Sequence, residues 1–249
     1  MKLLKDLLYR ARLEQVVGST HTAIEKLCFD SREVVPFTAF VAVKGTRSDG
    51  HDHIAAAVER GATAIICEHL PEGQKEGVTY VRVADSAQAL ALMAANFFDH
   101  PSRELKLVGI TGTNGKTSVA TLLYRLCRTL GIKAGLISTV EIRIGQRTVP
   151  STHTTPDAVR LNELLAEMVA EKCTHCFMEV SSHSVVQERI TGLEFDVAVF
   201  TNITHDHLDY HGTFAAYIEA KKRFFDQLGR NALALVNADD VNSAVMVQN

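Results

Sequence analysis

The stretch Leu105 to Gly131, LKLVGITGTNGKTSVATLLYRLCRTLG, predicts a strand, a glycine-rich turn and a helix in immediate succession. The strand is expected through Thr111, because that part is short and mostly apolar. The helix is expected from Thr117 to Leu130, with Gly131 as a left-handed residue at its end. Glycines let backbone N–H groups face an anion at a helix N-terminus, so this unit predicts a phosphate-binding loop.

Two side chains of the turn have expected roles at a bound phosphate. Lys116 would reach the β- and γ-phosphates of a nucleotide, and the Thr117 hydroxyl would hold Mg²⁺. The usual phosphate-loop pattern has a glycine five residues before Gly115, where this chain has Ile110, so only the second half of that pattern is present. The alternative is an ordinary glycine turn before a helix.

Working outward, short apolar strands alternate with amphipathic helices. Before the phosphate loop, strands are expected at 39–43, 63–67 and 79–83, and helices at 53–60 and 86–98. After it, strands are expected at 133–138, 177–180, 195–201 and 233–237, and helices at 157–171 and 214–228. The polar, proline-containing segment 99–102 marks a boundary. The pattern predicts two α/β domains: residues 1–101, and residues 102–249 with a mostly parallel sheet, incomplete at its C-terminus.

Composition and charge narrow the classes of protein. The 249 residues are 46% hydrophobic and 22% charged, which excludes disordered, collagen-like and low-complexity chains. The net charge of −3 gives no excess positive field, so we expect no nucleic-acid partner. No apolar run approaches the ~18 residues that cross a bilayer. Residues 1–12 lack the apolar core of a signal peptide, so we expect a cytoplasmic protein without membrane contact.

The five cysteines are an odd number in a large chain, which is typical of reduced thiols. Cys173 and Cys176 form one CxxC pair, and no second pair follows. A zinc or redox site is the alternative to two small core residues, and the lone pair favours the core.

A carboxylate follows a predicted strand of the same sheet as the phosphate loop. Glu179 opens the segment EVSSH, which ends at His183. Ligands of parallel sheets bind at the carboxyl ends of the strands, so Glu179 is placed to hold Mg²⁺ directly or through water. The alternative is a solvated loop glutamate.

The run Thr201 to His211, TNITHDHLDYH, concentrates metal-binding side chains after another predicted strand. Three histidines and two aspartates fall within seven residues. His205 and His207 have the spacing of an HxH metal pair, so a zinc hydrolase is an alternative function. The phosphate loop favours a nucleotide-binding enzyme instead.

Three further segments are ambiguous from their own residues. Lys221, Lys222 and Arg223 lie on an amphipathic helix, where solvated basic side chains are the ordinary expectation. Residues 29–32 (FDSR) and 45–50 (GTRSDG) flank predicted strands and are rich in hydrogen-bond donors. Each of these two is either an anion-binding turn or an ordinary turn.

Taken in order, these motifs resemble the Mur ligases of peptidoglycan synthesis along the whole chain. The resemblance rests on DSR at 30–32, GTNGKT at 112–117, HTTPDA at 153–158 and EVSSH at 179–183. It continues with Gln187 and Arg189, NITHDHLDYHGT at 202–213, and Ala220-Lys221. The phosphate loop of the family resembles the shorter form present here, which accounts for Ile110.

The resemblance implies a role for each matching position. ATP would be bound by Gly112, Thr113, Asn114, Gly115, Lys116, Thr117 and Ser118. The UDP end of the substrate would be bound by Ser31, Thr46, Arg47 and Ser48, and its diphosphate and sugar by Thr154, Thr155, Ser181, Gln187 and Arg189. One Mg²⁺ would be held by Thr117 and Glu179, and a second by His207 and Lys221, whose amine CO₂ would convert into a carboxylate-like carbamate. The catalytic residues would be Lys116, Lys221 and His207.

The resemblance also implies an ATP-dependent amide ligase that acts as a monomer. ATP would phosphorylate the D-Glu γ-carboxylate of UDP-N-acetylmuramoyl-L-Ala-D-Glu, the UDP-N-acetylmuramoyl-dipeptide. The amine of a diamino acid, meso-diaminopimelate or L-lysine, would then attack the acyl phosphate. Family members are much longer, so this chain is expected to be a fragment without the C-terminal ligase domain. Alone it would bind the UDP substrate but turn over poorly or not at all.

Other interpretations share part of this pattern. Folylpolyglutamate synthases have a similar ATPase core, but residues 1–101 disfavour them. Other Mur ligases are closer alternatives, and Thr154-Thr155 with DHLDYHGT at 206–213 favours the tripeptide-forming branch. Outside enzymes, the alternative is a non-catalytic nucleotide-binding module.

Overall fold

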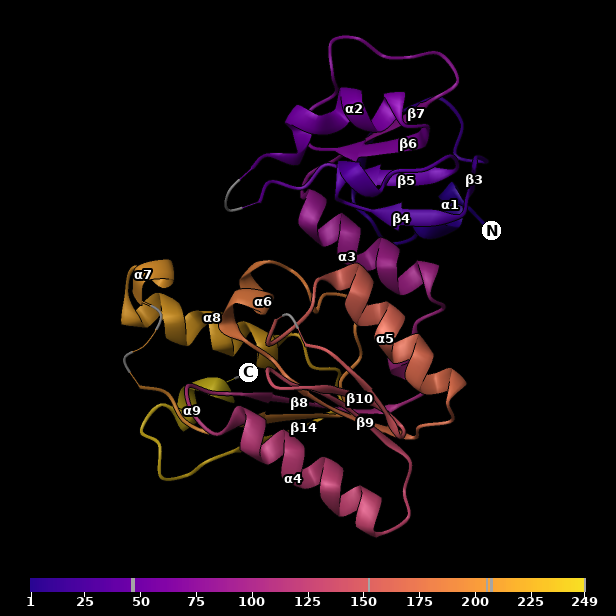
Figure 1. Ribbon diagram of the computed structural model, residues 1–249. Coiled ribbons are helices and arrows are strands. Elements are labelled where there is room, and N and C mark those ends of the chain that lie inside the picture. The colour runs from indigo at the N-terminus through magenta and orange to yellow at the C-terminus, as the bar shows by residue number, and fades with distance from the viewer. Residues whose placement is uncertain (46–47, 152, 205, 207, 249) are drawn as a thin grey trace. The chain divides into compact units, whose positions relative to one another are not determined.

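Two α/β units, Met1–Asp99 and His100–Asn249, make up the computed structural model of the chain (Figure 1). The structure describes residues 1–45, 48–151, 153–204, 206 and 208–248, without the side chains of Leu208 and Asp209. Among the described residues, none of the helices has the length and apolarity that crossing a membrane requires.

The first unit is built on a five-stranded sheet in the order β2-β7-β6-β5-β4. Its strands are β2 (Leu13–Val17), β4 (Lys26–Cys28), β5 (Thr38–Val41), β6 (Ala62–Cys67) and β7 (Thr79–Val83), and only β2 runs antiparallel to its neighbour. A separate antiparallel pair joins β1 (Lys2–Leu3) to β3 (Ala23–Ile24). The helices are α1 (Leu4–Leu7), α2 (Ile54–Glu59) and α3 (Ser86–Phe97). As expected for a cap residue, the Asp85 carboxylate accepts the Gln88 N–H at the start of α3.

The second unit is built on a seven-stranded sheet in the order β11-β10-β9-β12-β8-β13-β14. Its strands are β8 (Lys106–Thr111), β9 (Ala134–Ile137), β10 (Ile142–Ile144), β11 (Arg147–Val149), β12 (His175–Glu179), β13 (Val197–Phe200) and β14 (Leu233–Val236). The neighbouring strands β9, β12, β8, β13 and β14 all pair in parallel. Strands β10 and β11 form a hairpin that pairs antiparallel to β9 at one edge of the sheet. The prediction of a mostly parallel α/β sheet is therefore confirmed.

Helices lie on both faces of this second sheet. They are α4 (Lys116–Thr129), α5 (Ala158–Ala170), α6 (Ser182–Val186), α7 (Leu208–His211), α8 (Phe214–Asp226) and α9 (Ser243–Met246). Figure 1 shows α4 on one face, with α5, α6 and α8 on the other. Strand β8 sends Leu107 into the cluster under α5 and α8, and Val108 and Ile110 into the cluster under α4. Burial on both faces explains why this strand is apolar without alternation.

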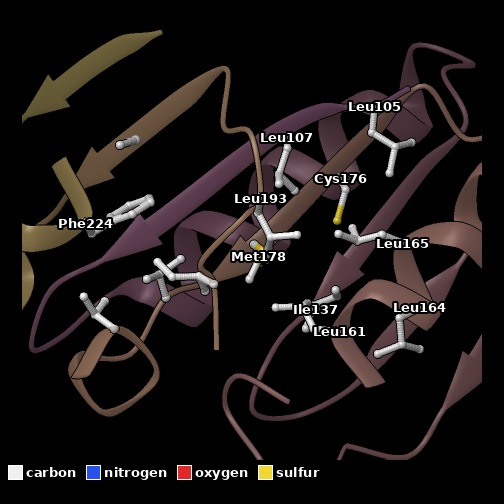
Figure 2. Packing of buried hydrophobic residues seen from close by; sticks show 14 of the residues in the cluster. Leu105, Leu107, Ile137, Leu161, Leu164, Leu165, Cys176, Met178, Leu193 and Phe224 are labelled. Carbon is white, nitrogen blue, oxygen red and sulfur yellow. The ribbon is translucent and has the colours of Figure 1, made fainter. Parts of the chain in front are cut away.

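The CxxC cysteines belong to the hydrophobic core. Cys173 and Cys176 are both buried and free, and Figure 2 shows Cys176 beside Leu105, Leu107 and Leu165. Burial raises the pKa of both thiols, so neither is readily ionised to the thiolate that binds zinc or reacts. The structure thus agrees with two small core residues.

Gly109 in β8 lies where two aromatic rings meet the sheet, so Gly109→Ala is expected to destabilise the second unit. An added Cβ would lie 2.5 Å from Phe224 Cζ and 2.8 Å from Phe195 Cε1, two rings packed edge to face at 4.9 Å. Overpacking of this kind costs roughly 1–3 kcal/mol. Urea unfolding followed by circular dichroism measures this loss in the free energy of unfolding. Gly229→Ala, where an added Cβ has no neighbour within 4 Å, is the control expected to leave the free energy of unfolding nearly unchanged. Equal values for the two variants would contradict this packing.

Candidate active site

The phosphate loop connects β8 to α4 and contains two glycines with positive φ. Gly112 has φ +147° and Gly115 has φ +87°, and both values favour glycine over any residue with a Cβ. Gly112 also has no room for a side chain, because an added Cβ would lie 1.9 Å from Thr201 Oγ1. The glycine spacing in the sequence is thus explained by backbone conformation and by close contact with the end of β13.

Residues that follow β13 hold this loop in place. The Thr113 N–H donates to the Asn202 carbonyl at 2.8 Å, and the Asn114 N–H donates to Asn202 Oδ1 at 3.0 Å. The Thr201 hydroxyl donates to the Asn114 carbonyl at 2.7 Å. Sequence reasoning gave Thr201 and Asn202 no individual role, although it singled out the run they begin. Their contacts fix the backbone of the loop against the end of β13.

Lys116 begins α4 and folds back over the phosphate loop. Its ammonium donates to the carbonyls of Gly112 at 2.8 Å and Thr113 at 2.9 Å. Burial lowers the pKa of Lys116, and the carboxylates of Glu179 and Asp206 act in the opposite direction. The structure therefore places this cation at the loop, as expected for a side chain that contacts phosphate oxygens.

Glu179 ends β12, which pairs in parallel with β8 so that Glu179 lies opposite Ile110, two residues before Gly112. Glu179 is buried, with 1% of the residue exposed. Oε1 accepts from the Thr117 hydroxyl at 2.9 Å and from the Thr139 N–H at 2.8 Å, and Oε2 from the Thr139 hydroxyl at 3.3 Å. A carboxylate beside a hydroxyl is an oxygen donor set that suits Mg²⁺, so the residues present fit that ion.

Lys221 is buried, and the expectation of a solvated lysine is wrong. Its side chain is 1% exposed, and its Nζ donates to the Gly112 carbonyl at 3.0 Å and lies 4.5 Å from the centroid of the Tyr217 ring. Helix α8 turns Tyr217, Lys221 and Phe224 inward at spacings of four and three, so the charge lies on the apolar stripe. Burial, followed by the nearby Lys116 charge, lowers the pKa of Lys221 to about 7.

A third cluster joins the residues expected to hold the diphosphate and sugar. The Thr155 hydroxyl donates to the Glu179 carbonyl at 2.9 Å and accepts the Ser181 N–H at 3.2 Å. Arg189 Nη1 donates to the Thr155 carbonyl at 2.6 Å, and its Nε and Nη2 donate to Gln187 Oε1 at 3.0 and 2.6 Å. Thr154 is linked to the Glu179 site through Thr139, because the hydroxyl oxygens of Thr139 and Thr154 are 3.1 Å apart. The second unit thus brings its predicted substrate-binding residues beside its predicted metal-binding carboxylate.

The first unit contains the residues expected to bind the UDP end. Ser31 follows Asp30, whose carboxylate is held by Arg32 at 2.6 Å, and hydrogen bonds from Arg32 lower the pKa of Asp30 to about 2. The Ser48 hydroxyl is 3.0 Å from His53 Nε2.

Some predicted residues lie outside the described part of the chain. They are Thr46, Arg47, His205 and His207. Within the described ranges, no group of three or more His, Cys, Asp or Glu side chains has an arrangement that could hold a metal ion. The HxH pair behind the zinc-hydrolase alternative is therefore not described by the structure.

The fold and these contacts define a phosphate-loop α/β protein. Residues 110–249 match the Mur ligase middle domain, and residues 23–98 match a domain described as the catalytic domain of the Mur ligase family. The first match alone covers more than half of the chain, so the chain belongs to the Mur ligase family.

The similar proteins include curated relatives named UDP-N-acetylmuramoyl-L-alanyl-D-glutamate–2,6-diaminopimelate ligase. The one from Cytophaga hutchinsonii is 56% identical over 247 residues, and the one from Bacteroides fragilis is 51% identical over 246 residues. Each match covers 99% of this chain and 51% of the relative, so the chain spans about half the length of the curated relatives it matches.

Solved structures show the same architecture. A structure of a ligase with that same name is 26% identical, with a TM-score of 0.82, and the match covers 99% of this chain and 49% of that chain. A structure of MurF from Acinetobacter baumannii has a TM-score of 0.64 at 21% identity, covers 98% of this chain and 50% of that chain, and shares the fold.

Proposed function

We propose that this chain carries the ATP-binding and UDP-substrate-binding parts of a ligase that adds meso-diaminopimelate to UDP-N-acetylmuramoyl-L-Ala-D-Glu. The observation that carries the proposal is the convergence of Lys116, Glu179 and Lys221 on one phosphate loop, with the Thr155–Arg189 cluster bonded to the Glu179 backbone. The names of relatives at 56% and 51% identity support diaminopimelate over lysine. We also propose that the protein acts in the cytoplasm as a monomer.

The geometry supports phosphorylation of a carboxylate by ATP. Backbone N–H groups of the phosphate loop and the Lys116 ammonium would bind the nucleotide phosphates and favour the charge that develops during transfer. The Thr155–Arg189 cluster would hold the anionic diphosphate of the UDP substrate and orient its D-Glu carboxylate toward the γ-phosphate. Mg²⁺, held through Glu179 and Thr117, would neutralise phosphate charge. The amine of the diamino acid would then displace phosphate from the acyl phosphate.

Lys221 is proposed to carry a CO₂-derived carbamate that, with His207, serves a second Mg²⁺. Only a neutral amine adds CO₂, and burial of Lys221 favours its neutral form. Its position over the Gly112 carbonyl places the modified group beside the phosphate loop. Carbon-13 NMR in labelled bicarbonate tests this step. A carbamate resonance is expected in the parent chain and not in Lys221→Met, and its absence from the parent would reject the modification.

Calorimetric titration tests the proposed function directly. The chain is expected to bind UDP-N-acetylmuramoyl-L-Ala-D-Glu and not a folylglutamate, after circular dichroism has shown that it is folded. Calorimetry suits this chain because it has no tryptophan to report binding by fluorescence. A folded chain that binds ATP but not the UDP ligand would instead indicate a nucleotide-binding module.

Replacing Glu179 with glutamine is expected to remove the dependence of ATP affinity on Mg²⁺. The amide keeps the shape of the side chain but loses the charge that attracts the cation. The parent should bind ATP on the order of tenfold or more tightly with Mg²⁺ than without it, and Glu179→Gln should bind it equally in both conditions. Glu163→Gln, which only breaks a surface pair with Arg160, is the control expected to behave as the parent does. Retained Mg²⁺ dependence in Glu179→Gln would remove Glu179 from the proposed metal site.

A further inference from the structure

Tyr210, on the short helix α7, contacts the Gln187–Arg189 pair and was assigned no role by its motif. Its hydroxyl accepts a hydrogen bond from Gln187 Nε2 at 3.2 Å. Its ring also packs against His183 of α6, with 4.1 Å between ring centroids. The segment that contains the histidine-rich motif is thus joined to the cluster that holds Arg189.

The hydrogen bond that Gln187 donates to Tyr210 holds the amide with its acceptor end toward Arg189. An amide has a donor end and an acceptor end, and a guanidinium has donors only. With Nε2 bonded to the tyrosine hydroxyl, Oε1 points toward Arg189 and accepts from its Nε and Nη2. An amide turned the other way would place N–H groups against N–H groups. The phenol therefore stabilises the one orientation that Arg189 can use.

This orientation leaves Arg189 ready to bind an anion. Within the described residues, Nε, Nη1 and Nη2 each donate to Gln187 Oε1 or to the Thr155 carbonyl. A guanidinium has five N–H donors, so one N–H on each terminal nitrogen stays free of these bonds. N–H groups held in the fixed plane of a guanidinium suit the oxygens of a phosphate or carboxylate.

We propose that Tyr210 is a positioning residue for the anionic substrate: its hydroxyl orients the Gln187 amide, and the amide fixes the Arg189 guanidinium. This inference rests on the proposed function, because it takes the Gln187–Arg189 pair as part of the site for the UDP-N-acetylmuramoyl-dipeptide. It also explains why the segment DYH has a tyrosine and not a phenylalanine, since the hydroxyl has a hydrogen-bond partner, Gln187 Nε2, at 3.2 Å.

Tyr210→Phe separates positioning from packing, because it removes the hydroxyl and keeps the ring against His183. The neighbouring bond between His211 Nε2 and Ser182 Oγ, 2.9 Å apart, also stays in place. The thermal midpoint is therefore expected to change little. Calorimetry should show UDP-N-acetylmuramoyl-L-Ala-D-Glu binding weakened about 3- to 10-fold, the range expected for one neutral hydrogen bond. Binding of ATP with Mg²⁺ should equal that of the parent.

Tyr124→Phe is the matched control. It removes an equivalent hydrogen bond in the same unit, from the Tyr124 hydroxyl to the Gly145 carbonyl at 3.2 Å. Tyr124 lies on α4, which covers the opposite face of the sheet from α6 and the Gln187 that ends it (Figure 1). Its affinity for both ligands is expected to match that of the parent. A drop in substrate affinity as large as that of Tyr210→Phe would show a general structural effect and overturn the inference.

A double-mutant cycle tests whether Tyr210 acts through Gln187. In a Gln187→Ala background, Tyr210→Phe should weaken substrate binding no further, because the amide it orients is gone. Additive losses in the two variants would overturn the inference, and so would an unchanged substrate affinity of Tyr210→Phe. Either result would leave the proposed function intact. A parent chain that is folded but does not bind the UDP ligand would overturn the proposed function, and this inference with it.

Discussion

The Lys116→Ala variant is expected to lose ATP-dependent phosphoryl transfer by roughly 10²- to 10³-fold while remaining folded. Lys116 is the cation that the phosphate loop itself positions, through its bonds to the carbonyls of Gly112 and Thr113. Alanine has no group that can reach a phosphate. The loss should appear both in substrate-dependent ADP release, in a protein that contains the complete active site, and in weaker binding of ATP to this chain.

The fold should persist in Lys116→Ala because other residues hold the loop. Asn202 accepts from Thr113 and Asn114, and Thr201 donates to Asn114, without any help from the lysine. Alanine is also a strong helix former at the first residue of α4. Lys106→Ala is a matched control, since it removes a positive charge from the start of β8, where an exposed pair with Asp196 contributes little. An unaltered rate of ADP release in Lys116→Ala would reject the proposed role of the lysine.

Local signals were sufficient for the strand–loop–helix at the centre of the second unit. The predicted strand and helix differ from β8 and α4 by one residue at their ends. Both elements are long enough for their hydrophobic pattern to be read, and glycines mark the loop and the helix end. The parallel direction of strands β8, β9, β12, β13 and β14 is then expected, because helices connect successive strands of this sheet.

Short elements were not predicted, because too few residues are present for a hydrophobic pattern to be read. Helix α6 has five residues, and β1 and β3 have two each, so none is long enough to repeat its hydrophobic pattern. They form because tertiary contacts favour them, as in α6, where the Ser181 hydroxyl accepts the Ser184 N–H. The hairpin of β10 and β11 extends the sheet edge in a region that gave no strand signal.

The candidate site shows where sequence and structure supply different information. The motif placed Glu179 and Thr117 in one site, and the parallel pairing of β12 with β8 brings them within 2.9 Å. Lys221 could not be assigned from its helix, because three adjacent basic residues do not reveal which one faces the core. The family resemblance singled out Lys221, and its packing against Tyr217 and the phosphate loop shows that it faces the core. The functional roles of these residues stay predictions.

Gly112→Ala is expected to disrupt the phosphate loop more than alanine at the other loop glycine, Gly115, would. The backbone there has φ +147°, which a residue with a Cβ rarely adopts, and the added carbon would lie 1.9 Å from Thr201 Oγ1. Strain and overpacking together are expected to lower the free energy of unfolding by about 2–5 kcal/mol. Gly131→Ala, at φ +77° with no neighbour within 4 Å, isolates the backbone contribution, at about 1–2 kcal/mol.

The clash in Gly112→Ala should also weaken ATP binding by displacing the Thr201 hydroxyl from the Asn114 carbonyl, which it now contacts at 2.7 Å. Removing that hydroxyl in a Gly112→Ala, Thr201→Ala double variant opens space for the new methyl group. Urea unfolding should then show a smaller loss than the sum of the two single variants, because each substitution relieves a cost of the other. Strict additivity would mean that the steric contact contributes nothing and that backbone strain at Gly112 accounts for the whole effect. Calorimetry with ATP on the same four proteins would separate a loop that is destabilised from a loop that no longer binds phosphate.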